Sequence, residues 1–481
     1  MTSHPTQRAV VLGASLAGLL AARVLSERFD EVLLLERDEL PTGAAPRKGT
    51  PHALQPHGLL ARGRLVLEEL FPGFTAALVA RGGLLGDMLA DVRFEASRQS
   101  FAPGFAGLPA LAASRLAIEA EIRQRVLALP GVRAITGVDV LAPRLDQGRI
   151  TGARWSERGA PAGHAPVEHG VAADLVVDCT GRASRLPQWL QDWSFEAPKE
   201  ERVEIGICYT SAYFKRIGSV AVGAGIARVA AFGAVTNEQP RPGVVIAQEP
   251  AEDGVPRWVL GVGGFAGDHI PATLEALRER ARDIGSPELV KISHEGELIG
   301  NVIRYQMPYS QRRHYERLAR FPQGLLAMGD ALTSFNPIYG QGMTVAACEA
   351  LALREALAQG SEGLARRFFR AAARVIDIPW QLAVGGDLSI DTVPGHRPLP
   401  VRVVNAYVAR LFRVAPHDAV VSAAFQKVVH MLARPESLFA PRILWRVLAK
   451  GGAGTTTRRG SPAHHSGSAA GPHGASLRSP R

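Results

Sequence analysis

The chain has 481 residues, of which 46% are hydrophobic and 21% charged, so it can bury the core of two or three structural units and is neither a disordered nor a fibrous protein. Its net charge of +10 lies almost wholly after residue 395, where thirteen Arg and Lys side chains oppose only Asp418 and Glu436. No basic stretch interleaved with aromatic residues and no reading helix is evident, so nucleic acid is not an expected partner. We interpret this charge as a solvated basic C-terminal region, with weak contact of residues 401–414 with a membrane surface as the alternative.

The three cysteines are far apart and lack ligand-like spacing, so neither a disulfide framework nor a structural metal is expected. The apolar stretch Ala9 to Leu25 is interrupted by glycines and an arginine, which does not fit a signal peptide. No uncharged run approaches the ~20 residues that span a bilayer. We therefore expect a cytoplasmic protein.

The chain begins with a β-α-β unit. Arg8 to Leu12 is predicted as a strand, Leu16 to Glu27 as a helix and Val32 to Leu35 as a second strand. The connection at residues 13–18 has the spacing of a dinucleotide-binding turn, with a tight turn at its first position and close helix–strand packing at its last. At the middle position the backbone approaches a pyrophosphate that lies on the amides of the helix N-terminus. The residues concerned are Gly13, Ser15, Ala17 and Gly18.

Glu36 ends the second strand, where a carboxylate can bind ribose hydroxyls and would repel a 2′-phosphate. The unit therefore suits the AMP half of FAD or NAD, and a ligand-free tight turn is the alternative. Ser15 also resembles the nucleophile of a G-x-S-x-G elbow. Ala17 stands where that motif needs its second glycine, so a hydrolase is not favoured.

Further helices are predicted at Gly58 to Leu70 and at Ser114 to Leu129, with Ser114 as the N-cap of the latter. Strands are predicted at Val132 to Val140 and Asp174 to Cys179. Residues 200–265 then change to short β-rich segments separated by glycine and proline, which predicts an antiparallel sheet in a second unit.

An α/β pattern returns at residues 321–358, and helices are predicted from there to about Lys450. The tail from Gly451 is rich in Gly, Ser, Thr, Pro and His and is predicted to be disordered.

A second glycine-rich turn follows the apolar residues 325–328. Its aspartate can accept hydrogen bonds from ribitol hydroxyls. The amides and dipole of the following helix, predicted at Met343 to Leu357, would face the pyrimidine edge of an isoalloxazine and stabilise the charge of a reduced flavin. Two such turns far apart in one chain predict a long, two-ended cofactor, FAD, and a plain strand–turn–helix connection is the alternative. The residues concerned are Gly329, Asp330, Pro337, Gly340, Gly342 and Met343.

Together with two further blocks, these turns resemble the FAD-dependent monooxygenases of the aromatic-hydroxylase type, nearest the branch that includes polyketide epoxidases. The resemblance covers about residues 8–375. One further block, residues 173–185, is similar to the family's aspartate–glycine block, with Gly181 and Asp178 kept and Thr180 in place of the usual aspartate. The other runs from Arg47 through Pro51 to His57, and here His52, Leu54 and Gln55 replace the family's glutamine and Arg-His pair.

The resemblance implies an α/β fold in which a discontinuous Rossmann-like FAD-binding domain is combined with a β-sheet substrate domain and a helical C-terminal region. Arg47 and Arg115 match positions that contact FAD, and Arg37 beside Glu36 is counted with them. The predicted FAD-binding parts are residues 1–75, 105–185 and 301–375; the substrate domain takes 76–104 and 186–300, the helical region 376–450 and the tail 451–481.

The implied activity is a hydroxylation or epoxidation in which NAD(P)H reduces FAD and O₂ adds to give a flavin C4a-hydroperoxide. The flavin carries this chemistry, so no catalytic side chain is named. The substrate would lie against the β-rich unit and would be an apolar, secondary-metabolite-like small molecule. Four aromatic residues suit such a molecule, although core packing explains them equally well: Phe214, Phe232, Trp258 and Phe265.

Other activities remain for comparison. A related halogenase would need a pocket lysine and a WxWxIP segment, but Lys48 is the only lysine before Lys199 and no such segment occurs. A FAD-dependent reductase of isoprenoid-type double bonds stays open, as does a non-catalytic FAD-binding protein. His52 and His57 have no carboxylate or cysteine at ligand spacing, so no metal is expected.

Overall fold

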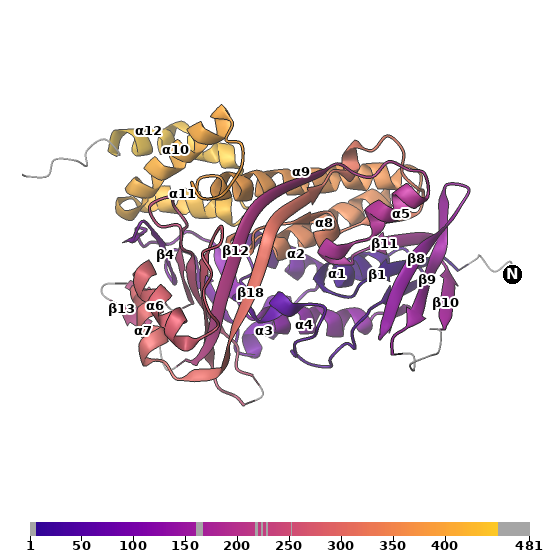
Figure 1. The fold of residues 1–481 in the computed structure, drawn as a ribbon, viewed down its shortest axis with the longest axis horizontal. Helices are drawn as coiled ribbons and strands as arrows, with labels where there is room; N and C mark the ends of the chain where they lie inside the picture. Colours follow the sequence, from indigo (N-terminus) through magenta and orange to yellow (C-terminus); the bar gives the residue numbers. More distant parts are fainter. Residues whose placement is uncertain are drawn as a thin grey trace, which may run out of the picture.

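The computed structural model describes residues 6–159, 167–216, 220–222, 225–227, 229–251 and 253–450. Figure 1 shows a parallel sheet with its helices, a large sheet that includes two long strands, and a group of C-terminal helices at one end of the molecule. The predicted α/β class, with a Rossmann-like unit, a β-sheet unit and a helical C-terminal region, is confirmed. The tail from Gly451 lies outside the described residues.

The Rossmann-like unit is built on a five-stranded sheet of order β19-β11-β1-β2-β7, in which all neighbouring strands are parallel. Because helices cover such a sheet, its strands are almost continuously apolar and buried. The strands are β1 (Arg8–Leu12), β2 (Glu31–Leu35), β7 (Val132–Ile135), β11 (Leu175–Asp178) and β19 (Leu325–Ala327).

Four helices contribute to the core of this sheet, together with buried residues of three shorter helices described below. Ser114 caps one of them as predicted, because its hydroxyl accepts a hydrogen bond of 3.0 Å from the amide of Ala117. The helices are α1 (Leu16–Leu25), α4 (Arg115–Leu127), α8 (Gly342–Ala358) and α9 (Leu364–Asp387).

The strand predicted at Val132 to Val140 is in fact two strands. Gly137 has a φ of +68° and turns the chain after β7. The continuation joins a separate three-stranded sheet of order β10-β9-β8. Its strands are β8 (Val138–Asp146), β9 (Arg149–Glu157) and β10 (Glu168–Ala172).

The second unit is an eight-stranded sheet of order β20-β18-β12-β17-β16-β15-β4-β5. The antiparallel sheet predicted for residues 200–265 is confirmed for β12, β15, β16 and β17. Strand β4 reaches the same sheet from earlier in the chain and pairs parallel with β15. Its shorter strands are β4 (Val92–Ala96), β5 (Gln99–Ser100), β15 (Ala230–Gly233), β16 (Gly243–Gln248), β17 (Arg257–Gly264) and β20 (Thr333–Ser334). Two strand pairs lie apart from it: β3 (Leu84–Asp87) with β6 (Pro109–Ala112), and β13 (Val220–Val222) with β14 (Gly225–Ala227).

Two strands of 16 residues each, β12 (Glu200–Lys215) and β18 (Leu298–Arg313), pair antiparallel along nearly their whole length and connect the two units (Figure 1). The boundary predicted at residue 300 therefore falls inside a continuous strand. The other domain boundaries stay predictions.

The remaining helices cover these sheets and form the C-terminal group. That group has a core of its own, in which Leu411, Val421 and Val447 pack with Phe101 and the neighbouring Phe94 of β4. None of the described helices combines the length and apolarity needed to cross a bilayer. They are α2 (Ala61–Leu70), α3 (Phe74–Ala80), α5 (Leu186–Asp192), α6 (Leu274–Ile284), α7 (Pro287–Glu295), α10 (Leu399–Val414), α11 (Ala419–Val429) and α12 (Pro441–Lys450).

Candidate cofactor and substrate site

The first glycine turn has the tight geometry that its sequence predicts. Gly13 has a φ of +95° and donates its amide hydrogen to the carbonyl of Leu35 at 2.8 Å. A side chain at Gly18 would place its Cβ 1.9 Å from the carbonyl oxygen of Gly13. Glycine at both positions is therefore required for α1 to start close to the end of β1, with its free amides facing outward.

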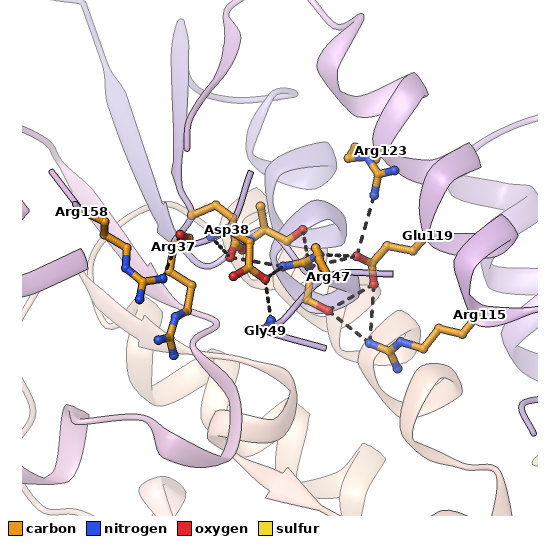
Figure 2. A network of polar contacts seen from close by, with 11 residues as sticks. Arg37, Asp38, Arg47, Gly49, Arg115, Glu119, Arg123 and Arg158 are labelled. Atoms are coloured by element: carbon orange, nitrogen blue, oxygen red, sulfur yellow. Dashed lines mark hydrogen bonds and ion pairs between the residues drawn. The ribbon is translucent and has the colours of Figure 1, made fainter. Parts of the chain in front are cut away.

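A buried ionic cluster surrounds this turn (Figure 2). The Arg47 guanidinium lies 3.2 Å from Glu36, 3.4 Å from Asp38 and 2.9 Å from Glu119, and it also donates to the carbonyl of Ala14. Burial lowers the pKa of Arg47, but the surrounding carboxylates raise it overall. Arg47 is thus a fixed cation that ties the second strand and α4 to the glycine turn.

Glu36 is held by this cluster as well as by the backbone. Its carboxylate accepts hydrogen bonds from the amides of Ala14, at 2.6 Å, and Asp38, at 3.1 Å. Figure 2 also shows Arg37 beside Arg158, and the carbonyl of Arg37 accepts a hydrogen bond of 3.2 Å from Arg158. Binding of a ribose by Glu36 stays a prediction.

Arg115, the first residue of α4, supplies a second cation near the start of α1. It donates to the Ser15 hydroxyl at 3.1 Å, and that hydroxyl donates to Glu119 at 3.3 Å. The Nε atom of Arg115 is buried without a hydrogen-bond partner. A helix N-terminus with an adjacent arginine is a favourable place for a phosphate, which would also satisfy the unpaired Nε.

The second glycine turn lies against the first. A Cβ placed on Gly329, whose φ is +69°, would be 2.5 Å from the Cβ of Ala17. Asp330 therefore lies next to the N-terminus of α1, although the two residues are far apart in sequence. Gly181, whose φ is +81°, also lies close to Asp330. A Cβ placed on Gly181 would be 3.9 Å from the Cβ of Asp330.

The carboxylate of Asp330 is open to a cavity but enclosed by protein. Burial raises its pKa, and the nearby cations of Arg115 and Arg182 oppose that shift. Within the described residues no hydrogen bond or ion pair of this carboxylate is present. An unsatisfied acceptor in an enclosed site indicates that a ligand with hydroxyl donors belongs there.

Beneath this turn, Glu349 of α8 accepts the amide hydrogen of Gly329 at 2.7 Å. Burial raises the pKa of Glu349 to about 8, so the group is largely neutral at pH 7. A neutral carboxyl can support the turn without placing a second full negative charge beside Asp330.

The N-terminus of α8 faces open space. Asn336 caps the preceding turn by accepting the amide hydrogen of Ile338 at 3.2 Å, and Gly340 adopts a φ of +64°. A Cβ built on Gly342 meets no atom within 4 Å. The free amides and the dipole of this 17-residue helix are therefore directed at the space that a ligand can occupy.

The loop after β11 is held by Asp178. This buried carboxylate accepts hydrogen bonds from the amide and hydroxyl of Thr180 and from the hydroxyl of Ser184. Burial raises the pKa of Asp178, while these hydroxyls oppose the shift. Thr180, which replaces the family's aspartate, thus contributes to the shape of the loop that carries Gly181.

One cavity of about 980 Å³ joins these features. Gly13, Gly18, Glu36 and Arg47 do not line it and instead shape or support its wall. Eleven of the fifteen predicted cofactor residues do line it: Ser15, Ala17, Arg37, Arg115, Gly181, Gly329, Asp330, Pro337, Gly340, Gly342 and Met343.

The same cavity continues from the polar end into an apolar end between the eight-stranded sheet and the C-terminal helices. Of the four aromatic residues for which substrate contact and core packing were both considered, only Phe232 lines it. Phe214 and Trp258 pack behind the sheet with α6 and α7, and Phe265 packs in a separate cluster. The apolar lining comes instead from Met88, Val92, Phe94, Phe232, Val244, Ile246, Met307, Leu382, Leu388, Phe412, Phe425 and Val428.

His52 and His57 lie at the junction of the two ends, with ring centroids 5.9 Å apart. Burial, together with the cation of Arg115, lowers the pKa of His57 to about 4 and that of His52 well below its ordinary value. Both rings are therefore neutral at pH 7. In the part of the chain that the structure describes, no cluster of three or more potential ligands that includes them is suited to a metal ion.

Sequence reasoning missed several residues of this site. Glu119 and Glu349 are single carboxylates within helices, and no local motif marks them. Arg182 stands within the matched block 173–185 and could have been chosen there. The contributions of α10 and α11 to the cavity depend on tertiary packing and leave no signal in the sequence.

Comparisons with known proteins can be set against this geometry. No family model matches the chain. Protein Rv3254 of Mycobacterium tuberculosis (strain ATCC 25618 / H37Rv) is 34% identical over 407 residues, which are 82% of this chain and 83% of that protein. The chain belongs to the same family as this protein.

Several solved structures share the fold. The flavin-dependent brominase Bmp2 is 18% identical, with a TM-score of 0.61 over 92% of this chain and 98% of its own. PqsL, a probable FAD-dependent monooxygenase from Pseudomonas aeruginosa, is 17% identical, with a TM-score of 0.57 over 80% of this chain and 97% of its own. The 2-methyl-3-hydroxypyridine-5-carboxylic acid oxygenase is 19% identical, with a TM-score of 0.57 over 89% of this chain and 96% of its own. The fold that the sequence resemblance implied, that of flavin-dependent monooxygenases, is confirmed.

Proposed function

We propose that this protein is a FAD-dependent oxidoreductase, a monooxygenase that hydroxylates or epoxidises an apolar small molecule with O₂. The observation that carries the proposal is the single cavity in which a dinucleotide turn, the unpaired carboxylate of Asp330 and the open N-terminus of α8 meet an apolar chamber. Neighbouring folds named as flavin-dependent enzymes and FAD-dependent monooxygenases support the cofactor. When bound, FAD would supply two-electron redox chemistry and the activation of O₂.

The residues present fit such a cofactor from end to end. The amides at the start of α1 and the guanidinium of Arg115 would hold the pyrophosphate. Asp330 would accept hydrogen bonds from ribitol hydroxyls, with Glu349 fixing the turn beneath it. The amides and dipole at Gly342 would stabilise negative charge on the flavin ring. No side chain is assigned a catalytic role.

The apolar chamber supports a substrate with little charge. Its walls are formed mainly by aliphatic and aromatic side chains, which bind by excluding water. The same walls would shield the reacting end of the cavity from water. NAD(P)H is proposed as the electron donor from the sequence resemblance alone, and a cytoplasmic location stays a prediction.

The visible spectrum of the purified protein, before and after incubation with FAD, tests the cofactor. We expect the absorption of a bound flavin. Protein that stays colourless after attempted reconstitution would refute the proposal. Oxygen consumption that depends on both NAD(P)H and a member of an apolar substrate panel would then support a monooxygenase.

The same assay separates the alternatives. Product formed without oxygen would favour a reductase of isoprenoid-type double bonds. Bound flavin that NADH and NADPH both fail to bleach, with every substrate tried, would favour a non-catalytic FAD-binding protein. Halogenation is disfavoured because no lysine is among the described residues that line the cavity.

A further inference from the structure

The last helix that the structure describes, α12, carries an apolar face that none of the described residues covers. The side chains of Trp445 and Leu448 are 67% and 49% exposed, although both belong to an ordered amphipathic helix. Ile443 and Val447 lie on the opposite face and are buried in the core of the C-terminal helices. The helix thus has one apolar face that the protein uses and a second one that it leaves in contact with solvent.

The first half of α10 has the same character. Leu399 is 69% exposed, Val403 59% and Val404 41%, and the only buried residues of the helix, Leu411 and Val414, lie near its end. Helices α10 and α12 pack against each other, and both lie at the end of the molecule occupied by the C-terminal group (Figure 1). We call the exposed parts of these two helices the C-terminal face.

Exposed arginines stand on the same two helices as these apolar side chains. Arg402, Arg413 and Arg442 are exposed, and within the described residues none of them has an acidic partner. Asp418, one of two acidic residues between 396 and 450, is buried and paired with Arg446. The C-terminal face therefore presents unneutralised guanidinium groups next to leucine, valine and tryptophan.

The apolar end of the cavity reaches the same place. Val401, Val404, Asn405 and Val408 of α10 line the cavity. Val404 is at once a lining residue and a large exposed hydrophobic residue of the C-terminal face. The apolar chamber consequently approaches the protein surface beside the uncovered helices, at the end remote from the predicted flavin turns.

We propose that the C-terminal face docks on an anionic lipid surface, and that apolar substrate enters the cavity from the bilayer past the first half of α10. Arginines around exposed apolar side chains, with a tryptophan among them, match the chemistry of a lipid interface, where the charged groups meet headgroups and the apolar ones enter the acyl boundary. A symmetric contact between two copies is less favourable, because it would bring like charges together. The substrate part of this inference rests on the proposed function, whereas the lipid part does not.

Sedimentation of the full-length protein with phosphatidylcholine vesicles, with and without phosphatidylglycerol, tests the lipid contact. We expect binding only to the anionic vesicles, weakened by salt. The variant carrying Trp445→Glu and Leu448→Glu should bind about tenfold more weakly. Leu127→Glu is the matched control, because Leu127 is 38% exposed on α4 of the other unit, and it should bind like the wild type.

Failure of the wild-type protein to sediment with anionic vesicles overturns the proposal, as does equal binding by the Trp445/Leu448 variant and the control. A concentration-dependent dimer that the α12 variant abolishes, without vesicle binding, would assign the C-terminal face to self-association instead. Circular dichroism and flavin content of each variant exclude misfolding as the cause of a loss. Vesicle binding does not require FAD, so this test remains decisive even if the flavin proposal fails.

Uptake of a fluorescent polyene fatty acid from the vesicles tests the entry route. Val408→Trp, at a residue of α10 that lines the cavity and is not among the exposed apolar residues of the C-terminal face, should slow transfer of the probe to the protein about tenfold while leaving vesicle binding unchanged. Unchanged transfer in this variant would exclude entry past α10. Transfer that is equally fast from vesicles to which the protein does not bind would exclude entry from the bilayer.

Discussion

The two ends of the cavity are built by different means. At the proposed cofactor end, backbone geometry makes the site together with helix N-termini and a few fixed charges. Three of its glycines, Gly13, Gly18 and Gly329, leave no room for a Cβ. At the proposed substrate end, side-chain volume makes the site, and the apolar residues come from at least five separate segments of the chain. One added methyl group can therefore disrupt the proposed cofactor end, whereas the proposed substrate end can change its shape without loss of the fold.

Gly18→Ala tests the cofactor end most severely. The new Cβ would be 1.9 Å from the carbonyl oxygen of Gly13, so the turn must move, at a cost of about 3 kcal/mol. We expect a lower melting temperature and loss of flavin. Gly43→Ala is the control, because its Cβ meets nothing within 4 Å. Equal melting temperatures for the two variants would contradict the packing argument.

Asp330→Ala should purify largely without flavin. It removes about two charge-assisted hydrogen bonds to the ribitol, together worth about 3 kcal/mol, or about a hundredfold in FAD affinity. Titration of the apoprotein with FAD gives the measurement. Asp192→Ala, at the exposed end of α5, serves as the control. If Asp330→Ala retains FAD with unchanged affinity, the role assigned to this carboxylate is wrong.

Glu349→Gln should change how stability depends on pH. Burial raises the pKa of Glu349 to about 8, so from its ordinary pKa up to about 8 the folded protein holds a proton that the unfolded chain has lost. The stability contributed by the neutral carboxyl is complete below the ordinary pKa and is lost as the pH rises through about 8. The free energy of unfolding of the Gln variant should therefore exceed that of the wild type increasingly towards high pH, by on the order of 4 kcal/mol at pH 8.

The control for that experiment is Glu355→Gln, since Glu355 is an exposed carboxylate on the same helix. Replacement of this exposed side chain should change the free energy of unfolding by less than about 0.5 kcal/mol. A stability difference between Glu349→Gln and the wild type that does not vary with pH would mean that the buried carboxyl of Glu349 is ionised in the folded protein.

Phe232→Leu and Phe214→Leu test the substrate end. Phe232 lines the cavity, so its replacement should change the KM of an apolar substrate several-fold and leave flavin content and melting temperature nearly unchanged. Phe214 is fully buried behind the sheet, so its replacement should cost about 1 kcal/mol of stability without altering substrate preference. The reverse pattern would show that the cavity has been assigned to the wrong face.

Removal of residues 451–481 should have the smallest effect. The composition of this tail offers almost nothing to bury, so flavin content and activity should be unchanged, and stability should change by less than about 0.5 kcal/mol. A large loss in any of the three would mean that the tail packs against the protein.

The sequence was most informative where geometry restricts the residue type. Gly13 and Gly18 indicate a βα turn because few other residues fit at these positions. The spacing from this turn to Glu36 follows from the length of the β-α-β unit. Nothing comparable marks Glu119 or Glu349, whose roles depend on which element packs against their helix. The sequence around these two residues does not indicate which element packs against their helices.

The same limit applies to the β-rich unit. Phe214, Phe232 and Trp258 all stand in short β-rich segments, and only the packing of α6 and α7 on one face of the sheet decides which of them becomes core. Likewise, the pairing of β12 with β18 and the position of α10 over the cavity are long-range features. Their prediction would require knowledge of the tertiary arrangement.

The contact between Ala17 and Gly329 has a consequence for synthesis. The two residues are 312 positions apart in the sequence, and β19, which precedes Gly329, completes the parallel sheet. For the proposed flavin site, a nascent chain arrested before β19 leaves the ribosome should therefore capture no flavin. Supply of the cofactor could then assist folding only after about two thirds of the chain has been synthesised.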